Sequence, residues 1–167
     1  MASTYELIAS VTVGAGGASS IDFTSIPATY TDLVVKLSTR GTYSSFNDSV
    51  YYHFNGDTSS RTVRTLVGTG TAAQSQSYST MMLRDGVGST ATSNTFANGE
   101  IYIPNYAGST YKSSSGDIVS ENNATDAIKG MTANLWSNTA AINRVTLTGD
   151  GNFVQYSTAY LYGVKNA

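Results

Sequence analysis

The sequence contains no cysteine and a single histidine, His53. The missing thiols exclude disulfides, thiolate metal sites and cysteine nucleophiles. Zinc in proteins is held by Cys, His, Asp and Glu, so a zinc site here would have to be completed by carboxylates. Alternation places His53 inside a strand, between Tyr52 and Phe54. We interpret it as a partly exposed structural residue rather than a catalytic one.

Charged residues are also scarce. They make up 12% of the chain, against roughly 25% in a typical soluble domain. The net charge is -2 and the basic residues are scattered, which excludes the basic patch expected of a nucleic-acid-binding protein. No stretch reaches the ~18 apolar residues of a membrane span, and no charged-then-apolar start indicates a signal peptide. We therefore expect neither nucleic acid nor membrane as a partner.

Hydroxyl and amide groups replace the missing charge, with 23 Ser, 23 Thr and 12 Asn alongside 12 Tyr. Hydrophobic residues still make up 40% of the chain, whereas disordered polar segments are poor in aromatic and β-branched residues. A chain of 167 residues is long enough to bury a real core. We predict one folded domain over residues 1–167.

Apolar residues recur at every second position, which is the period of a half-buried β-strand. A row of this kind runs from Tyr5 to Val13. Three further rows are the clearest: the first is Leu33, Val35 and Leu37; the second is Val50, Tyr52 and Phe54; the third is Val145 and Leu147. Short strands joined by polar loops are typical of sandwiches and jelly rolls. The sequence predicts an all-β protein, an antiparallel β-sandwich, jelly-roll-like, with about eight to ten strands.

Between these rows the pattern weakens. Residues 68–77 and 84–94 are rich in small polar residues and are predicted as loops, with a strand at 78–83 between them. Residues 124–131 are predicted as a helical turn or a loop. The segment Gly149-Asp150-Gly151-Asn152 predicts a hairpin turn, because Asp-Gly tolerates the positive φ of a type I′ turn.

No set of catalytic residues stands out. A glycoside hydrolase needs two carboxylates set roughly 5 to 9 Å apart, and nothing in the sequence pairs the strand acids Glu6, Asp22 and Glu100. Residues 68–73 match a G-x-G-x-x-A phosphate loop, but the helix that this motif must open does not follow. We assign no catalytic and no cofactor-binding residues, and we predict a non-enzymatic protein.

Two turn motifs, Asn55-Gly56-Asp57 and Asp150-Gly151-Asn152, carry oxygen atoms of the kind that Ca²⁺ prefers. Neither has the spacing of an EF-hand. Asn and Asp in turns also bond to their own backbone, and this explanation is enough for both motifs. We favour it and assign no metal ligand, with calcium as the open alternative.

Tyrosine suits surfaces that are apolar on one side and wet on the other, as at subunit interfaces. Tyr156, Tyr160 and Tyr162 fall on one face of the last predicted strand and are our candidate interface. No Lys and no Pro occur between Phe153 and Gly163, although these residues usually protect the edge of a sheet. We therefore expect association through this strand, unless it lies inside the sheet with its tyrosines packed in the monomer.

Four segments resemble parts of a known group of proteins: Tyr5–Ala9, Ile21–Arg40 with the run IDFTSIPATYTDL, the HFNGD turn at His53–Asp57, and the closing AYLYGVKNA at Ala159–Ala167. They are similar to small β-rich structural proteins of tailed bacteriophages. These include capsid decoration and head-fibre proteins and tail-associated jelly-roll proteins. The resemblance spans the outline of the domain, and residues 58–131 match least.

The resemblance implies a virion protein, assembled in the host cytoplasm, that decorates the capsid or forms a head fibre and binds other virion subunits. It also implies a symmetric homo-oligomer, commonly a homotrimer, and it brings no active-site residues. Specificity for partners would lie in residues 58–131. The alternative is a tail-associated receptor-binding module that recognises a host-surface glycan.

Overall fold

The computed structural model describes residues 4–59, 61–68, 73–122 and 127–165. Within these ranges the chain forms twelve β-strands, and it contains no helix long and apolar enough to cross a membrane. The first six strands are β1 (Tyr5–Thr12), β2 (Ala18–Phe23), β3 (Asp32–Thr39), β4 (Asn47–Phe54), β5 (Arg61–Gly68) and β6 (Ala73–Tyr78). The others are β7 (Met82–Val87), β8 (Ala97–Pro104), β9 (Lys112–Glu121), β10 (Ala127–Trp136), β11 (Val145–Phe153) and β12 (Thr158–Val164).

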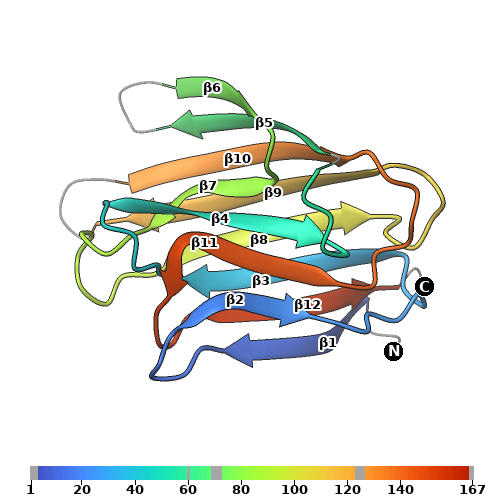
Figure 1. Ribbon diagram of the computed structural model, residues 1–167, viewed down its shortest axis with the longest axis horizontal. Coiled ribbons are helices and arrows are strands. Elements are labelled where there is room, and N and C mark those ends of the chain that lie inside the picture. The colour runs from blue at the N-terminus through green and yellow to red at the C-terminus, as the bar shows by residue number, and fades with distance from the viewer. Residues whose placement is uncertain (1–3, 60, 69–72, 123–126, 166–167) are drawn as a thin grey trace.

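The strands form two antiparallel sheets that pack as a β-sandwich (Figure 1). The larger sheet has the order β1-β12-β3-β8-β9-β10-β5-β6, and the smaller has the order β2-β11-β4-β7. The chain alternates between β1-β12-β3-β8 and the smaller sheet in the strand order of a jelly roll. Two hairpins, β5–β6 and β9–β10, extend the larger sheet beyond β8. The predicted fold class is confirmed, and these hairpins explain why the described strands outnumber the predicted eight to ten.

The core lies between the two sheets, where the inward rows meet. Leu33, Val35 and Leu37 on β3 are buried, as are Val145 and Leu147 on β11. On β4 the row Val50, Tyr52 and Phe54 is buried as well. Burying a side chain of this size contributes roughly 1.5 to 3 kcal/mol, which is why the alternation alone located these strands correctly.

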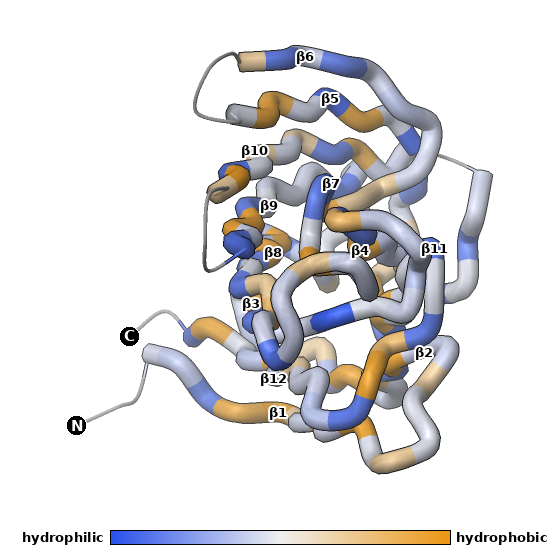
Figure 2. Tube along the Cα trace, turned by 90° about the vertical axis from the view of Figure 1, so that its left-hand side faces the viewer, coloured by the Kyte–Doolittle hydropathy of each residue, from blue (hydrophilic) through white to orange (hydrophobic). Residues whose placement is uncertain are grey.

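The smaller sheet does not cover the whole of the larger one. Strand β7 lies against β9 and β10, but β5 and β6 project beyond it (Figure 1). Figure 2 shows the larger sheet from one side, with β6 at one edge and β1 at the other. In β6 the residues from Ala73 to Ser77 are all exposed. This strand has a neighbour on one side and little cover on its faces.

Three segments predicted as loops contain strand residues, while residues 88–94 lie outside the strands as predicted. Residues 73–77 belong to β6, residues 84–87 to β7, and residues 127–131 to β10; residues 69–72 and 124–126 of these predictions lie outside the described residues. The predicted strand at 78–83 is wrong at its centre, where the chain crosses from β6 to β7. Strand β6 carries only small or polar side chains apart from Tyr78, and its strand form depends on pairing with β5, which alternation cannot reveal.

The hairpin predicted at 149–152 is also wrong, because these residues continue β11. The amide of Asp150 donates to Asp48 Oδ1 over 2.9 Å, and the amide of Asn152 donates to Thr42 Oγ1 over 2.9 Å. A Cβ on Gly151 would stand 2.4 Å from the Tyr43 amide nitrogen. Glycine is therefore required here for a close approach of two segments rather than for a turn.

A bulge interrupts the first strand. The pairing of β1 with β12 shifts between Leu7 and Ala9. A bulge moves the following residues to the other face, so the predicted row from Tyr5 to Val13 does not share one face. Leu7 is exposed, whereas Val13 is buried.

Candidate functional site: the outer face of the larger sheet

One face of the larger sheet is directed away from the smaller sheet, and we call it the outer face. Eleven large apolar side chains are exposed among the described residues. Eight of them lie on strands of the larger sheet at outward positions: Tyr5, Leu7, Leu66, Tyr102, Val119, Met131, Leu135 and Tyr160. Large exposed apolar patches mark interaction surfaces, so the outer face is the candidate site.

An aromatic cluster covers the outer face of β3. The register sets Val34 opposite Tyr162 on β12 and opposite Tyr102 on β8. Val34 points away from the core yet is only 1% exposed, because cross-strand side chains on one face lie within contact distance. Tyr5 meets Tyr162 edge-on, with ring centroids 6.4 Å apart. The cluster is thus a small apolar layer outside the sandwich.

The tyrosine hydroxyls of this cluster lie beside charged groups. Tyr102 Oη donates to Asp32 Oδ2 over 2.8 Å. This hydrogen bond, together with burial, raises the pKa of Tyr102 above its ordinary value. The hydrogen bond therefore holds the ring of Tyr102 in one orientation.

A row of charged side chains crosses the sheet next to the cluster. Lys36 Nζ donates to Glu100 Oε2 over 2.6 Å, and the hydrogen bond raises the pKa of Lys36. Lys129 forms an ion pair with Asp117, and the register sets Asp117 opposite Glu100. Exposed pairs of this kind contribute little to stability. Their effect here is to neutralise the centre of the outer face.

A groove of about 500 Å³ lies beside this row. One side is formed by Glu100 and Tyr102 of β8, and the other by Arg64 and Leu66 of β5. Ser115 of β9 is among the small side chains that line it between these two sides. The groove therefore offers an aromatic ring, a carboxylate, a guanidinium group and a hydroxyl to one ligand.

The three predicted interface tyrosines do not form one row. Tyr160 and Tyr162 lie on the outer face, because the alternate residues Ala159 and Leu161 of β12 are buried. Tyr156 precedes β12 in a turn, with φ of 71° and 68% of its surface exposed. Strand β12 lies between β1 and β3, so it is not an edge. We expected association through this strand because it lacks the residues that protect a sheet edge, and this reason is wrong. A role of Tyr160 and Tyr162 as an interface stays a prediction.

The single histidine is half-buried on β4. Its Nδ1 lies 3.0 Å from Nη1 of Arg61. Burial, and then the charge of Arg61, lower the pKa of His53 below its ordinary value. The imidazole packs beside a permanent cation.

The strand acids are engaged in separate contacts. Glu6 accepts from Lys165 Nζ over 2.5 Å, and Asp22 accepts from Arg144 Nη2 over 2.5 Å. The neighbouring pair of Glu100 with Asp117 was missed by sequence reasoning, because only the sheet register brings the two strands together. Each carboxylate of this pair is bound by a lysine and remains more than 40% exposed.

Both turn motifs have internal partners for their oxygen atoms. Asn55 Oδ1 accepts the amides of Asn143 and Arg144 over 2.9 and 3.1 Å, and Asp57 Oδ2 accepts from Trp136 Nε1 over 2.8 Å. Asp150 Oδ1 accepts from the Tyr51 hydroxyl over 2.8 Å. Among the described residues, no three or more His, Asp or Glu side chains are grouped so that they could hold a metal ion.

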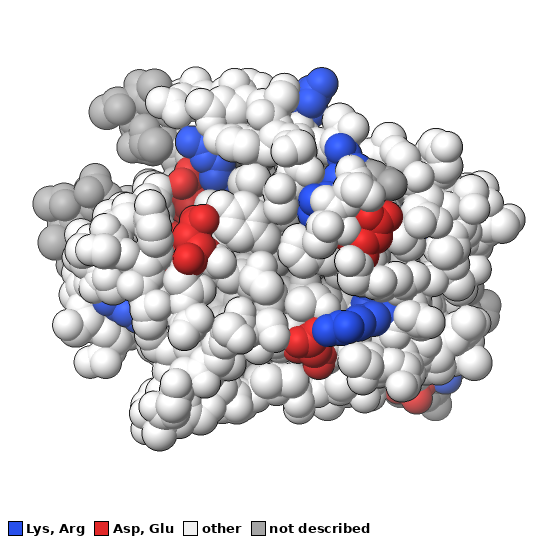
Figure 3. All heavy atoms as spheres, in the orientation of Figure 1, with Lys and Arg blue, Asp and Glu red and all other residues white. Residues whose placement is uncertain are grey.

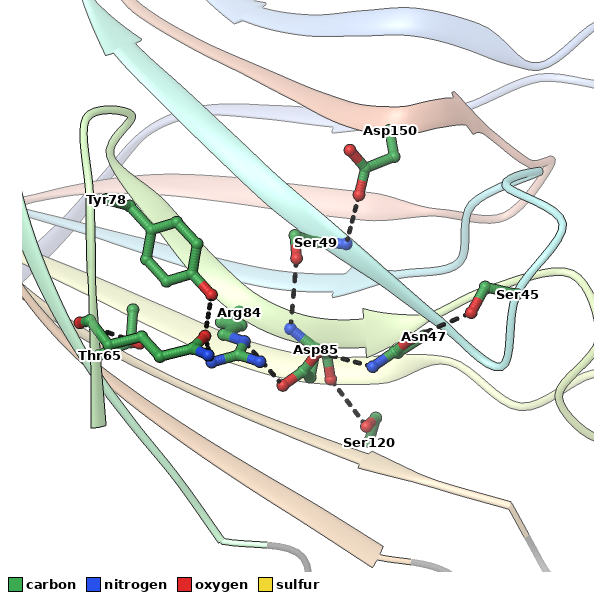
Figure 4. A network of polar contacts seen from close by, with 10 residues as sticks. Ser45, Asn47, Ser49, Thr65, Tyr78, Arg84, Asp85, Ser120 and Asp150 are labelled. Carbon is green, nitrogen blue, oxygen red and sulfur yellow. Dashed lines mark hydrogen bonds and ion pairs between the residues drawn. The ribbon is translucent and has the colours of Figure 1, made fainter. Parts of the chain in front are cut away.

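A buried polar network joins β7 to its neighbours (Figure 4). Asp85, with φ of 66°, accepts from Asn47 Nδ2 over 2.6 Å, and its backbone carbonyl accepts from Ser120 Oγ over 2.8 Å. Burial raises the pKa of Asp85, although Arg84 and Asn47 act in the opposite direction. Arg84 Nη1 also donates to Gln76 Oε1 over 2.5 Å, which ties β6 to β7.

Charged side chains are sparse on the rest of the surface. On the face drawn in Figure 3 they lie mostly beside groups of opposite sign, separated by wide uncharged areas. Comparison with known proteins gives no further guide: no family model, no curated protein and no solved structure matches the chain. The resemblance to phage structural proteins therefore stays a prediction.

Proposed function

We propose that the protein is a non-enzymatic structural component of a tailed-bacteriophage particle, most simply a capsid decoration or head-fibre protein. The observation that carries the proposal is the outer face, where eight large apolar side chains remain exposed in one sheet. A monomer gains nothing by exposing such a surface, whereas an assembled particle buries it against other subunits. The jelly roll and the resemblance of four segments support the same role.

Retention on particles tests this proposal. Leu66 and Met131 are opposite each other in the register of β5 and β10 and are 49% and 53% exposed. Replacing both by lysine should leave folding intact, because exposed substitutions usually change stability by no more than about 0.5 kcal/mol. We expect binding to particles that lack the protein to fall at least about tenfold, since each buried lysine must be desolvated at the interface.

The matched control is Tyr111→Lys, which changes a side chain that is 59% exposed in the connection before β9. This variant should bind particles as the unchanged protein does. Equal retention of the Leu66→Lys, Met131→Lys variant and the control would contradict the proposed binding face. Failure of the unchanged protein to bind particles would contradict the structural role itself.

The groove supports one second candidate, a tail-associated module that binds a host-surface glycan. Tyr102, Glu100 and Arg64 can stack on and hydrogen-bond to a sugar ring from the two sides of the groove. A glycan array tests this function. We expect any specific signal to be lost in Arg64→Gln and kept in Arg144→Gln, where the arginine lies just before β11 of the smaller sheet and binds Asp22.

A further inference from the structure

The larger sheet ends at β6, and no described strand pairs with the outer side of this strand. Unpaired edges of this kind are templates for pairing with another chain, and proteins usually protect them with charges, proline or bulges. The other three sheet edges carry charged residues: Glu6 on β1, Asp22 on β2, and Arg84 with Asp85 on β7. Strand β1 has a bulge as well.

Strand β6 has none of these protections. Its sequence, Ala-Gln-Ser-Gln-Ser-Tyr, contains no charge and no proline. Its six residues pair with β5 in continuous register, without a bulge. Gln76 Oε1 accepts from the Tyr78 hydroxyl and from Arg84 Nη1. The contact with Arg84 fixes β6 to β7 and leaves the unpaired edge of β6 open. The result is a straight, neutral edge with its backbone groups presented outward.

We infer that β6 pairs antiparallel with β6 of a second copy of the chain, about a two-fold axis perpendicular to the sheet. The alternation of Gln and Ser makes the strand complementary to itself. With the axis at Ser75, Gln74 stands opposite Gln76 of the other copy, and Ser75 stands opposite its own equivalent. An isologous pair of this kind is closed, because it uses the same edge of both subunits.

The position of the axis follows from charge. An axis at Gln76 would bring the two Arg84 side chains together, because each of them lies on Gln76. Centring the pair on Ser75 separates these like charges. Because directly opposite residues of an antiparallel pair share a face, the two outer faces lie on one side of a continuous sheet. The inference holds whether or not the protein belongs to a phage particle.

The mass of the protein in solution tests the inference, by light scattering over micromolar concentrations. We expect a dimer. The variant Ser75→Lys with Ser77→Lys should have half this mass, because lysines on an edge oppose pairing and the two lysines at position 75 would stand directly opposite one another. The matched control, Ser10→Lys with Thr12→Lys, places two exposed lysines with the same spacing on β1 and should remain a dimer. Circular dichroism of all three confirms that each is folded.

A second measurement locates the contact without relying on a loss of binding. The chain has no cysteine, so Ser75→Cys introduces a single thiol that a short bis-maleimide should join across the axis in high yield. Ser10→Cys on β1 should give little product. A monomer or a trimer of the unchanged protein would overturn the inference, and a trimer would favour the assembly implied by the phage resemblance. A dimer that the β6 lysines leave intact but Tyr160→Lys dissociates would overturn it too, by placing the contact on the outer face.

Discussion

Asp85 shows how one buried carboxylate makes stability depend on pH. Burial raises its pKa above the ordinary value of 3.8, so between these values the folded state binds more protons than the unfolded state. Its contribution to stability is therefore greatest at low pH and is lost as the pH rises through the raised pKa. We expect Asp85→Asn, which does not titrate, to gain stability relative to the unchanged protein as the pH rises from about 4 through the raised pKa of Asp85.

Asp22 provides a control of opposite sign. Burial alone would raise its pKa, but hydrogen bonds from Thr146, Arg144 and Ser20 lower it overall. Asp22→Asn should therefore lose stability relative to the unchanged protein as the pH rises from below the lowered pKa of Asp22 to its ordinary value of 3.8, with no further change above that pH. Urea unfolding at a series of pH values measures both slopes, and parallel curves for Asp85→Asn and the unchanged protein would contradict the first prediction.

Leu37 and Leu66 separate the two faces of the larger sheet. Leu37 is 3% exposed in the core and Leu66 is 49% exposed on the outer face. Leu37→Ala should lower the free energy of unfolding by about 2 to 5 kcal/mol, because a cavity adds to the lost burial. Leu66→Ala should change it by no more than about 0.5 kcal/mol. Equal losses in denaturant titrations would show that the assignment of the faces is wrong.

At the scale of elements, the connection from β7 to β8 is organised by one side chain. Arg40 Nη1 donates to the carbonyl oxygens of Thr92 and Thr95 over 2.7 and 3.1 Å. Its Nη2 donates to those of Ser89 and Ala91, each over 3.0 Å. Burial lowers the pKa of Arg40. A single guanidinium group thus satisfies four backbone acceptors that belong to no strand.

Replacing Arg40 by methionine should therefore loosen this connection. We expect a loss of about 2 kcal/mol or more, because hydrogen bonds from charged groups are strong and each of the four carbonyls would lose a charged donor. Hydrogen exchange should become faster in residues 88–96 but change little in β3. The control Arg64→Met removes an arginine whose Nη1 bonds only to the carbonyl of its neighbour Val63; a similar loss there would contradict the special role of Arg40.

The strands that the sequence predicts well are those that alternate between core and solvent. Strands β3 and β4 belong to this class. Strand β10 alternates too, but polar Asn134 is among its buried residues, whereas Leu135 faces out. Pairing with β5 and β9 decides which residues of β10 face inward, and no local pattern encodes this pairing. Strand β6 has no buried row at all, so periodicity had nothing to detect.

For the molecule as a whole, the candidate site depends on register between distant strands. Sequence alternation placed Tyr160 and Tyr162 on one face, and the structure agrees. The groove could not be predicted, because Arg64, Tyr102 and Ser115 meet only when β5, β8 and β9 enter the same sheet. Two inserted hairpins thus create the part of the outer face that most resembles a binding site.

Hydrogen exchange should distinguish the edge strand β6 from the strands that are paired on both sides. At low concentration we expect the amides of β6 to exchange faster than those of any other strand, because it has one strand neighbour and exposed faces. The amides of β3 and β12, paired on both sides, should exchange slowest. Raising the protein concentration should slow exchange in β6 alone if the edge pairs with a second copy. Equal exchange rates in β6, β3 and β12 at all concentrations would contradict this prediction.

The position of β12 between β1 and β3 also bears on how the protein is synthesised. Within the described residues, β12 is the sole strand partner of β1 and one of two partners of β3. Until residues 158–164 have left the ribosome, β1 has nothing to pair with and one side of β3 stays open. Before that point the nascent chain carries unpaired strand edges, which expose it to aggregation. We expect its last strand to be the element whose emergence allows the sandwich to close.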